Sequence, residues 1–217
     1  MSFTNLSVFP NPKTIQSNDI IAIGGFLNKE TLWDAYSHGI FPWPHPNHPL
    51  LWFCPNPRAI LEFSDFHIPS RVIRELKKVS WTFKKNTYFE KVIRNCATIS
   101  NRKGQTGTWI TENMIQAYID FHQAGYVTSY EVWDEKHQLI GGLYGVRIGN
   151  FFAGESMFHH VSGASKYALI HTIESLKKEG LTWMDIQQLT PLLQLFGGKE
   201  IPRKDFLEKL APPAQTL

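Results

Sequence analysis

The amino-acid sequence predicts a mixed α+β fold in which a mainly antiparallel sheet is flanked by helices. Three apolar segments, YVTSYEVW, QLIGGLYGVRI and NFFAGESMF, follow one another with only the turn signals DEKH and IGN between them. Segments rich in β-branched and aromatic residues and bounded by such turns are typical of consecutive antiparallel strands. Amphipathic helical segments precede and follow this meander, and a last strand, LTWMDIQ, comes after the second helix.

The N-terminal part has a different composition. The segment LNKETLWDAYSHG predicts a short helix with Asn28 as its N-cap and Gly39 as its stop. Six prolines then fall between Phe41 and Arg58. Because proline lacks an N–H and fixes φ, this stretch predicts a rigid loop or a domain junction and excludes regular helix or central strand. We place the boundary near residue 60, with a small N-terminal domain over 1–60 and a larger domain over 61–217.

The two helices around the meander carry recognisable ends. Thr111 as N-cap and Gly125 as stop predict the first helix. The segment SGASK, at 162–166, lacks the full phosphate-loop pattern and predicts the start of the second helix, with Ser162 as its cap.

Composition limits the class of protein. With 42% hydrophobic and 19% charged residues among 217, the chain is expected to fold as a globular protein. No apolar run approaches the ~20 residues that span a bilayer, and no signal peptide is recognisable, so we expect a cytoplasmic, soluble protein. The cysteines form no CxxC pair and the histidines lack a third ligand at zinc spacing, so no metal site is predicted.

Positive charge gathers in the segment RVIRELKKVSWTFKK, which contains a single acid, Glu75. Its basic residues are Arg71, Arg74, Lys77, Lys78, Lys84 and Lys85. The spacing of Arg71, Arg74 and Lys78 would place them on one helix face. Both a solvated helix face and a phosphate-binding patch fit this pattern.

Three polar side chains interrupt apolar strands. In TWMDIQQL, alternation puts Asp185 and Gln187 on one face, about 7 Å apart. Glu155 stands within the apolar segment FFAGESMF. An unpaired buried carboxylate is costly, so each acid should either pair with an arginine or backbone groups or line a wet cleft. Three such groups on neighbouring strands favour a functional site.

The order of helix, meander, helix and strand resembles the GNAT-like acyltransferase fold. The motifs AYSHGIFPW, LWFCPNPRAIL, GTWIT, FFAGESMF, ASKYAL, MDIQ and GGKEIPRKDFL, in this order, resemble the bacterial leucyl/phenylalanyl-tRNA–protein transferases. The resemblance implies a small N-terminal domain preceding a GNAT-like catalytic domain. It also implies transfer of Leu, Phe or Met from aminoacyl-tRNA to the α-amine of proteins with N-terminal Arg or Lys, which marks them for degradation. The aminoacyl ester is already activated, so we expect no cofactor, and we expect a monomer.

The resemblance also implies roles for particular residues. Asp185 would accept a hydrogen bond from the acceptor amine and help its proton to leave, while Gln187 would bind the reacting groups or the oxyanion. Glu155 would present negative charge to the cationic acceptor. Trp43 and Trp109 would hold the terminal adenosine of the tRNA by stacking.

The residues that match the family's donor side-chain pocket are Leu143, Phe152, Met157, Leu169, Thr172 and Met184. Thr172 stands where an aromatic residue is frequent, so it could widen the pocket. The basic segment becomes a candidate contact for tRNA phosphates.

Two alternatives remain open from the sequence. An acetyl-CoA-dependent GNAT N-acyltransferase would need the Gly-rich pyrophosphate segment, which does not precede the helix that follows the meander. A non-catalytic RNA-binding module would have no use for Asp185 and Gln187.

Overall fold

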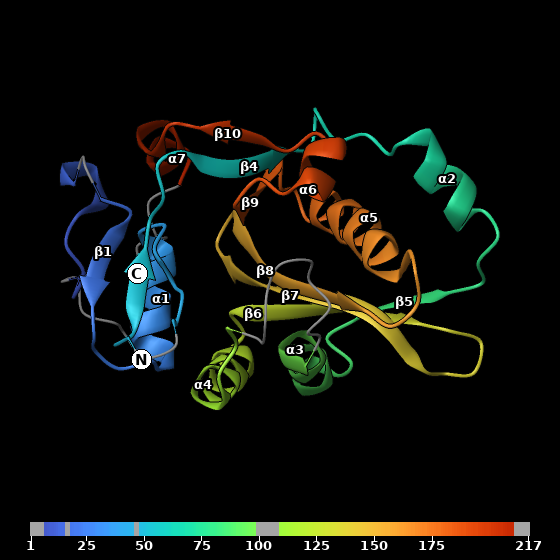
Figure 1. Cartoon of the computed structure of the whole chain (residues 1–217), viewed down its shortest axis with the longest axis horizontal. Coiled ribbons are helices and arrows are strands. Elements are labelled where there is room, and N and C mark those ends of the chain that lie inside the picture. Colours follow the sequence, from blue (N-terminus) through green and yellow to red (C-terminus); the bar gives the residue numbers. More distant parts are fainter. Residues whose placement is uncertain (1–6, 16–17, 46–47, 99–108, 211–217) are drawn as a thin grey trace.

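The computed structural model describes residues 7–15, 18–45, 48–98 and 109–210, and in them the chain forms two sheets (Figure 1). The smaller sheet has three strands in the order β1-β3-β2. Its strands are β1 (Ile20–Ile23), β2 (Phe41–Pro42) and β3 (Leu51–Phe53).

The larger sheet has seven strands in the order β10-β4-β9-β8-β7-β6-β5. They are β4 (Arg58–Glu62), β5 (Thr82–Lys85), β6 (Val127–Trp133), β7 (Leu139–Ile148), β8 (Phe151–His159), β9 (Trp183–Gln187) and β10 (Lys199–Ile201). The predicted meander is confirmed as β6-β7-β8, whose neighbours pair antiparallel. The pairing of β8 with β9 is parallel, because helix α5 (Ala164–Lys178) carries the chain back between them.

Helices cover both faces of the larger sheet and confirm the mixed α+β class. In Figure 1, α3 (Phe89–Thr98) and α4 (Glu112–Gln123) lie on one side of the sheet and α5 (Ala164–Lys178) lies on the other. The remaining helices are α1 (Lys29–Ser37), α2 (Ser70–Leu76), α6 (Pro191–Leu195), α7 (Arg203–Lys209) and the 3₁₀ turn η1 (Pro12–Thr14). None of the helices in the described ranges is long and apolar enough to cross a membrane.

Two predicted N-caps are confirmed. The Asn28 side chain accepts a hydrogen bond from the Thr31 N–H at 2.9 Å, and the Thr31 hydroxyl accepts one from the Asn28 N–H at 3.1 Å, which closes a capping box on α1. At α4, the Thr111 hydroxyl accepts the Met114 N–H at 3.3 Å. These caps need only local geometry, which explains why the sequence predicts them.

The predicted cap of α5 is wrong. Gly163, with φ of +88°, is the N-cap, and no side chain among the residues that the structure describes caps the helix there. The Ser162 hydroxyl instead donates to Glu75 Oε1 at 3.2 Å, and Lys166 Nζ donates to Glu75 Oε2 at 2.7 Å. A carboxylate from α2 therefore lies at the start of α5.

The proline-rich stretch contains more regular structure than predicted. Its segment Leu51–Phe53 is free of proline and forms β3, the central strand of the smaller sheet. Pro42 lies in β2, an edge strand, where the missing N–H is tolerated. The larger sheet begins at Arg58.

One apolar core joins the two sheets. Leu32 of α1 and Trp52 of β3 belong to the same buried cluster as Ile93 of α3 and Phe206 of α7. A second cluster lies on the α5 side of the larger sheet and includes Ile173. The first cluster packs α1 and the small sheet against the large sheet near Glu155 of β8 and Asp185 of β9.

Candidate functional site

A cavity of about 430 Å³ opens where β2 approaches β7, β8 and β9. Apolar side chains form much of its wall: Leu143, Met157, Leu169, Met184, Ile186 and Leu193. Aromatic and proline residues from the proline-rich stretch and from position 109 also line it: Phe41, Pro42, Trp43 and Trp109. Its polar lining includes Glu155 and Gln187. The cavity thus joins an apolar space, aromatic rings and a carboxyl–amide pair.

A β-bulge aims Glu155 into this cavity. In the β7–β8 ladder, Tyr144 pairs with Ser156 and Gly145 pairs with Gly154, so Glu155 is the extra residue. A bulge reverses the alternation of the strand beyond it. As a result Met157 packs on the same apolar cluster as Phe152, five positions earlier, which a regular strand would not allow.

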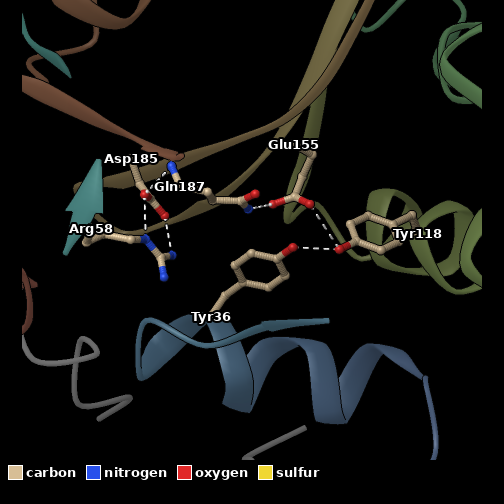
Figure 2. Close-up of polar contacts among 6 residues, drawn as sticks. All are labelled: Tyr36, Arg58, Tyr118, Glu155, Asp185 and Gln187. Carbon is tan, nitrogen blue, oxygen red and sulfur yellow. Dashed lines mark hydrogen bonds and ion pairs between the residues drawn. The ribbon is translucent and has the colours of Figure 1, made fainter. Parts of the chain in front are cut away.

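Glu155 lies in a chain of buried polar groups (Figure 2). Its Oε1 accepts a hydrogen bond from Gln187 Nε2 at 2.7 Å, and its Oε2 accepts one from the Tyr118 hydroxyl at 3.4 Å. The Tyr118 hydroxyl is 2.5 Å from that of Tyr36 on α1. Burial, aided by the charge of Asp185, raises the pKa of Glu155 to about 7 against the opposing effect of its hydrogen bonds. A carboxyl with such a pKa exchanges its proton near neutral pH.

Gln187 connects two parts of the site. It is the last residue of β9, and its φ of +60° ends the regular strand. Its side chain reaches Glu155, while its backbone N–H donates to Asp185 Oδ1 at 2.9 Å. Figure 2 shows the two side chains diverging from β9, with Gln187 directed towards Glu155 and Asp185 towards Arg58.

Asp185 does not belong to the lining of the cavity. Its two oxygens accept hydrogen bonds from Arg58 Nε at 2.8 Å and Arg58 Nη2 at 2.6 Å, and both side chains are fully buried. Of the two arrangements open from the sequence, the structure adopts the buried ion pair. The carboxylate that was expected at the acceptor amine is therefore occupied by a guanidinium.

Arg58 was missed by the sequence analysis. The available signal was a lone cation at the head of β4, followed directly by three buried apolar residues, Ala59, Ile60 and Leu61. Nothing in the spacing connects it with Asp185, because 127 residues separate the two.

Both tryptophans assigned to adenosine stacking line the cavity. Trp43 packs against Phe53, with ring centres 5.6 Å apart, and lies 5.5 Å from the ring of His45. Trp43 and Trp109 are each partly exposed, so part of each indole remains open to a ligand.

The predicted donor pocket is partly rearranged. Leu143, Met157, Leu169 and Met184 line the cavity, whereas Phe152 and Thr172 do not. Those two side chains are completely buried. The Thr172 hydroxyl finds no hydrogen-bond partner within the described residues.

Two aliphatic side chains of the cavity wall were not predicted. Ile186 lies on β9 beside Gln187, and Leu193 comes from the short helix α6. The position of Ile186 could have been found from strand alternation, but the sequence offers no comparable signal for Leu193.

The six basic residues of the segment 71–85 are all exposed but do not share one helix face. Helix α2 ends at Leu76, so Lys77 and Lys78 lie in the turn that follows, and the predicted face loses Lys78. On β5, Lys85 Nζ pairs with Glu179 at 2.6 Å, and Lys84 Nζ lies 5.3 Å from the ring centre of Trp133.

The raised pKa of Glu155 predicts a specific pH dependence of stability. Between pH 4.5 and about 7 the carboxyl is ionised in the unfolded chain but protonated in the fold, so its contribution to stability falls as pH rises. Glu155→Gln removes this titration. The free energy of unfolding of the variant, relative to the parent, should rise by about 2 kcal/mol from pH 5 to pH 8. Urea unfolding at both pH values measures it, and a constant difference would show that Glu155 is already ionised in the fold at pH 5.

Comparison with known proteins identifies the family. The family model described as "Leucyl/phenylalanyl-tRNA protein transferase" matches residues 60–211, and that of its N-terminal domain matches residues 26–56. A protein of that name from Shewanella halifaxensis is 45% identical over 93% of this chain and 85% of its own length. Proteins of the same name from Anaeromyxobacter dehalogenans and Legionella pneumophila are 42% and 41% identical, over 94% and 97% of this chain and 86% and 93% of their own lengths. This chain belongs to the leucyl/phenylalanyl-tRNA–protein transferase family.

Proposed function

We propose that this protein transfers leucine, phenylalanine or methionine from an aminoacyl-tRNA to the α-amine of a protein that begins with Arg or Lys. The observation that carries the proposal is the cavity in which Glu155 and Gln187 lie between an apolar wall and two tryptophans. The apolar wall suits the side chain of the donor amino acid, the tryptophans suit the adenine, and the Glu155–Gln187 pair suits the reacting carbonyl. Family membership supports the same activity.

The reaction requires positioning and the net movement of one proton from the amine to the ribose oxygen. The amine nitrogen attacks the ester carbonyl carbon, the carbon–oxygen bond to the ribose breaks, and the ribose oxygen leaves as a hydroxyl. An α-ammonium has a pKa near 8, so roughly a tenth of it is free amine at pH 7. Holding the amine and the ester in contact then supplies most of the acceleration.

We assign the proton transfer to Glu155 rather than to Asp185. Glu155 borders the cavity and has a pKa of about 7, so it can accept the surplus proton of the amine and return one to the ribose oxygen. Gln187 donates to Glu155 and can turn its amide towards the developing oxyanion.

The tryptophans and the basic segment suit the tRNA. Stacking of a base on Trp43 or Trp109 is worth about 1–3 kcal/mol. The exposed basic residues of α2 and the turn after it, Arg71, Arg74, Lys77 and Lys78, are proposed to contact phosphates.

We further propose that residues 61–217 form a GNAT-like domain that follows a small domain over 1–60. The order α4, β6-β7-β8, α5 and β9 supports this reading. An acetyl-CoA enzyme of this fold would bind pyrophosphate at the start of α5, but Glu75 occupies that position: a Cβ on Gly163 would lie 2.9 Å from its Oε1. The placement of this carboxylate favours the tRNA ester as donor.

The test of this function is transfer without ATP or coenzyme A. The protein, radiolabelled leucyl-tRNA and a peptide beginning with Arg should yield labelled peptide. Glu155→Gln should slow single-turnover transfer at least about tenfold, because the proton acceptor is lost.

Glu131→Gln is the matched control, since Glu131 is also a buried carboxyl on the sheet but does not line the cavity. It should leave the rate nearly unchanged. Absence of labelled peptide with the parent protein would refute the proposed activity, and equal rates for parent and Glu155→Gln would refute the role of Glu155.

The cavity wall predicts that the donor amino acid is selected by the shape of its side chain at Cβ. Leu and Ile contain the same atoms, but Ile is branched at Cβ, close to the reacting carbonyl. Deeper in the cavity, the flexible side chains of Met157 and Met184 can adapt either to the branched end of Leu or to the ring of Phe. With one tRNA body charged with each amino acid, transfer of Leu, Phe and Met should exceed that of Ile and Val by about tenfold or more. Equal use of Leu and Ile would contradict the assignment of this wall to the donor side chain.

The basic residues predict a salt-dependent contact. Arg74→Glu together with Lys78→Glu should weaken tRNA binding and make the plot of log affinity against log salt shallower by about two counterions. The control, Lys91→Glu with Lys204→Glu, reverses two exposed charges elsewhere and should leave the slope closer to that of the parent. If both pairs change the slope equally, the segment 71–85 has no special contact with tRNA.

A further inference from the structure

Gln187 holds a backbone conformation that its residue type rarely adopts. Within the described chain, three non-glycine residues have positive φ: Asn86, His137 and Gln187. Asn and His are enriched in this region, but Gln is not. Such a conformation persists only where its surroundings hold it, and it is frequent at functional sites.

The group that holds it is the Asp185 carboxylate. Asp185 Oδ1 accepts the Gln187 N–H at 2.9 Å and, at the same time, Arg58 Nε at 2.8 Å. Arg58 Nη2 binds the second oxygen at 2.6 Å. A two-point contact of this kind fixes the plane of the carboxylate, which a single-point contact does not.

The guanidinium is itself fixed from two sides. Arg58 Cζ lies 4.7 Å from the centre of the Phe41 ring and 4.5 Å from that of the Phe206 ring. Phe41 belongs to β2 of the small sheet and Phe206 to α7, so two distant segments clamp the guanidinium. No charged group other than Asp185 is bonded to it in the described chain.

We propose that Arg58 is a positioning residue for aminoacyl transfer. It orients Asp185, Asp185 holds the left-handed backbone of Gln187, and that backbone directs the Gln187 amide to Glu155 at the cavity (Figure 2). Arg58 and Asp185 act through Gln187 and do not touch the substrate. This inference rests on the proposed function, because it concerns the geometry of the same site.

The test is a double-mutant cycle on single-turnover transfer. Arg58→Lys keeps a positive charge but loses the two-point contact and the flat surface between the rings. It should lower the transfer rate about tenfold with little change in the KM for leucyl-tRNA. In a Gln187→Ala background the same substitution should lower the rate by less than about twofold, because the amide that Arg58 orients is gone.

A purely structural role predicts a different outcome. Arg58→Lys would then lower the rate by the same factor in both backgrounds, and this result would overturn the proposal, as would an unchanged rate for Arg58→Lys alone.

If Arg58→Lys does not fold, Phe206→Leu replaces it in the cycle, since it removes one of the two rings and leaves the ion pair. Phe63→Leu, at another buried phenylalanine, is the control and should not couple to Gln187→Ala. Lack of transfer by the parent protein would refute the proposed function itself, which separates the two failures.

Discussion

The buried ion pair of Arg58 and Asp185 is the constraint on which the rest of the site depends. Two charges taken out of water are tolerated only with near-ideal geometry, and loss of one partner from such a pair typically costs about 3–5 kcal/mol. Here the geometry is supplied by both oxygens, two guanidinium nitrogens and two flanking rings. The pair therefore fixes β4 against β9 and, through Phe41 and Phe206, fixes the small sheet and α7 against both.

The parts of the fold that the sequence predicts are those with local causes. Asn28 and Thr111 cap helices with their own side chains, and the meander follows from short turns between apolar strands. Ser162 is the counterexample. It was expected to cap α5, but its hydroxyl donates a hydrogen bond to Glu75 of α2 instead. Residues far apart in the chain decide that contact, and no local pattern records it.

The candidate site shows the same division. Its carboxyl and amide residues were recognised because polar side chains are unusual in apolar strands, yet their partners were not. The bulge at Glu155, the left-handed backbone of Gln187 and the pairing of Asp185 with Arg58 arise where strands meet. Phe152 and Thr172 were expected at the cavity but lie behind its lining, because depth below a surface cannot be read from spacing.

The bulge in β8 also limits how this enzyme can change during evolution. Strand alternation has a period of two, so removal of one residue at the bulge would turn Met157 away from the cavity and bring Phe158 towards it. Exchange of one wall side chain for another leaves the remaining residues in place. Donor preference in such a protein can therefore change by single substitutions, whereas an insertion or deletion in this strand would rearrange the whole wall beyond it.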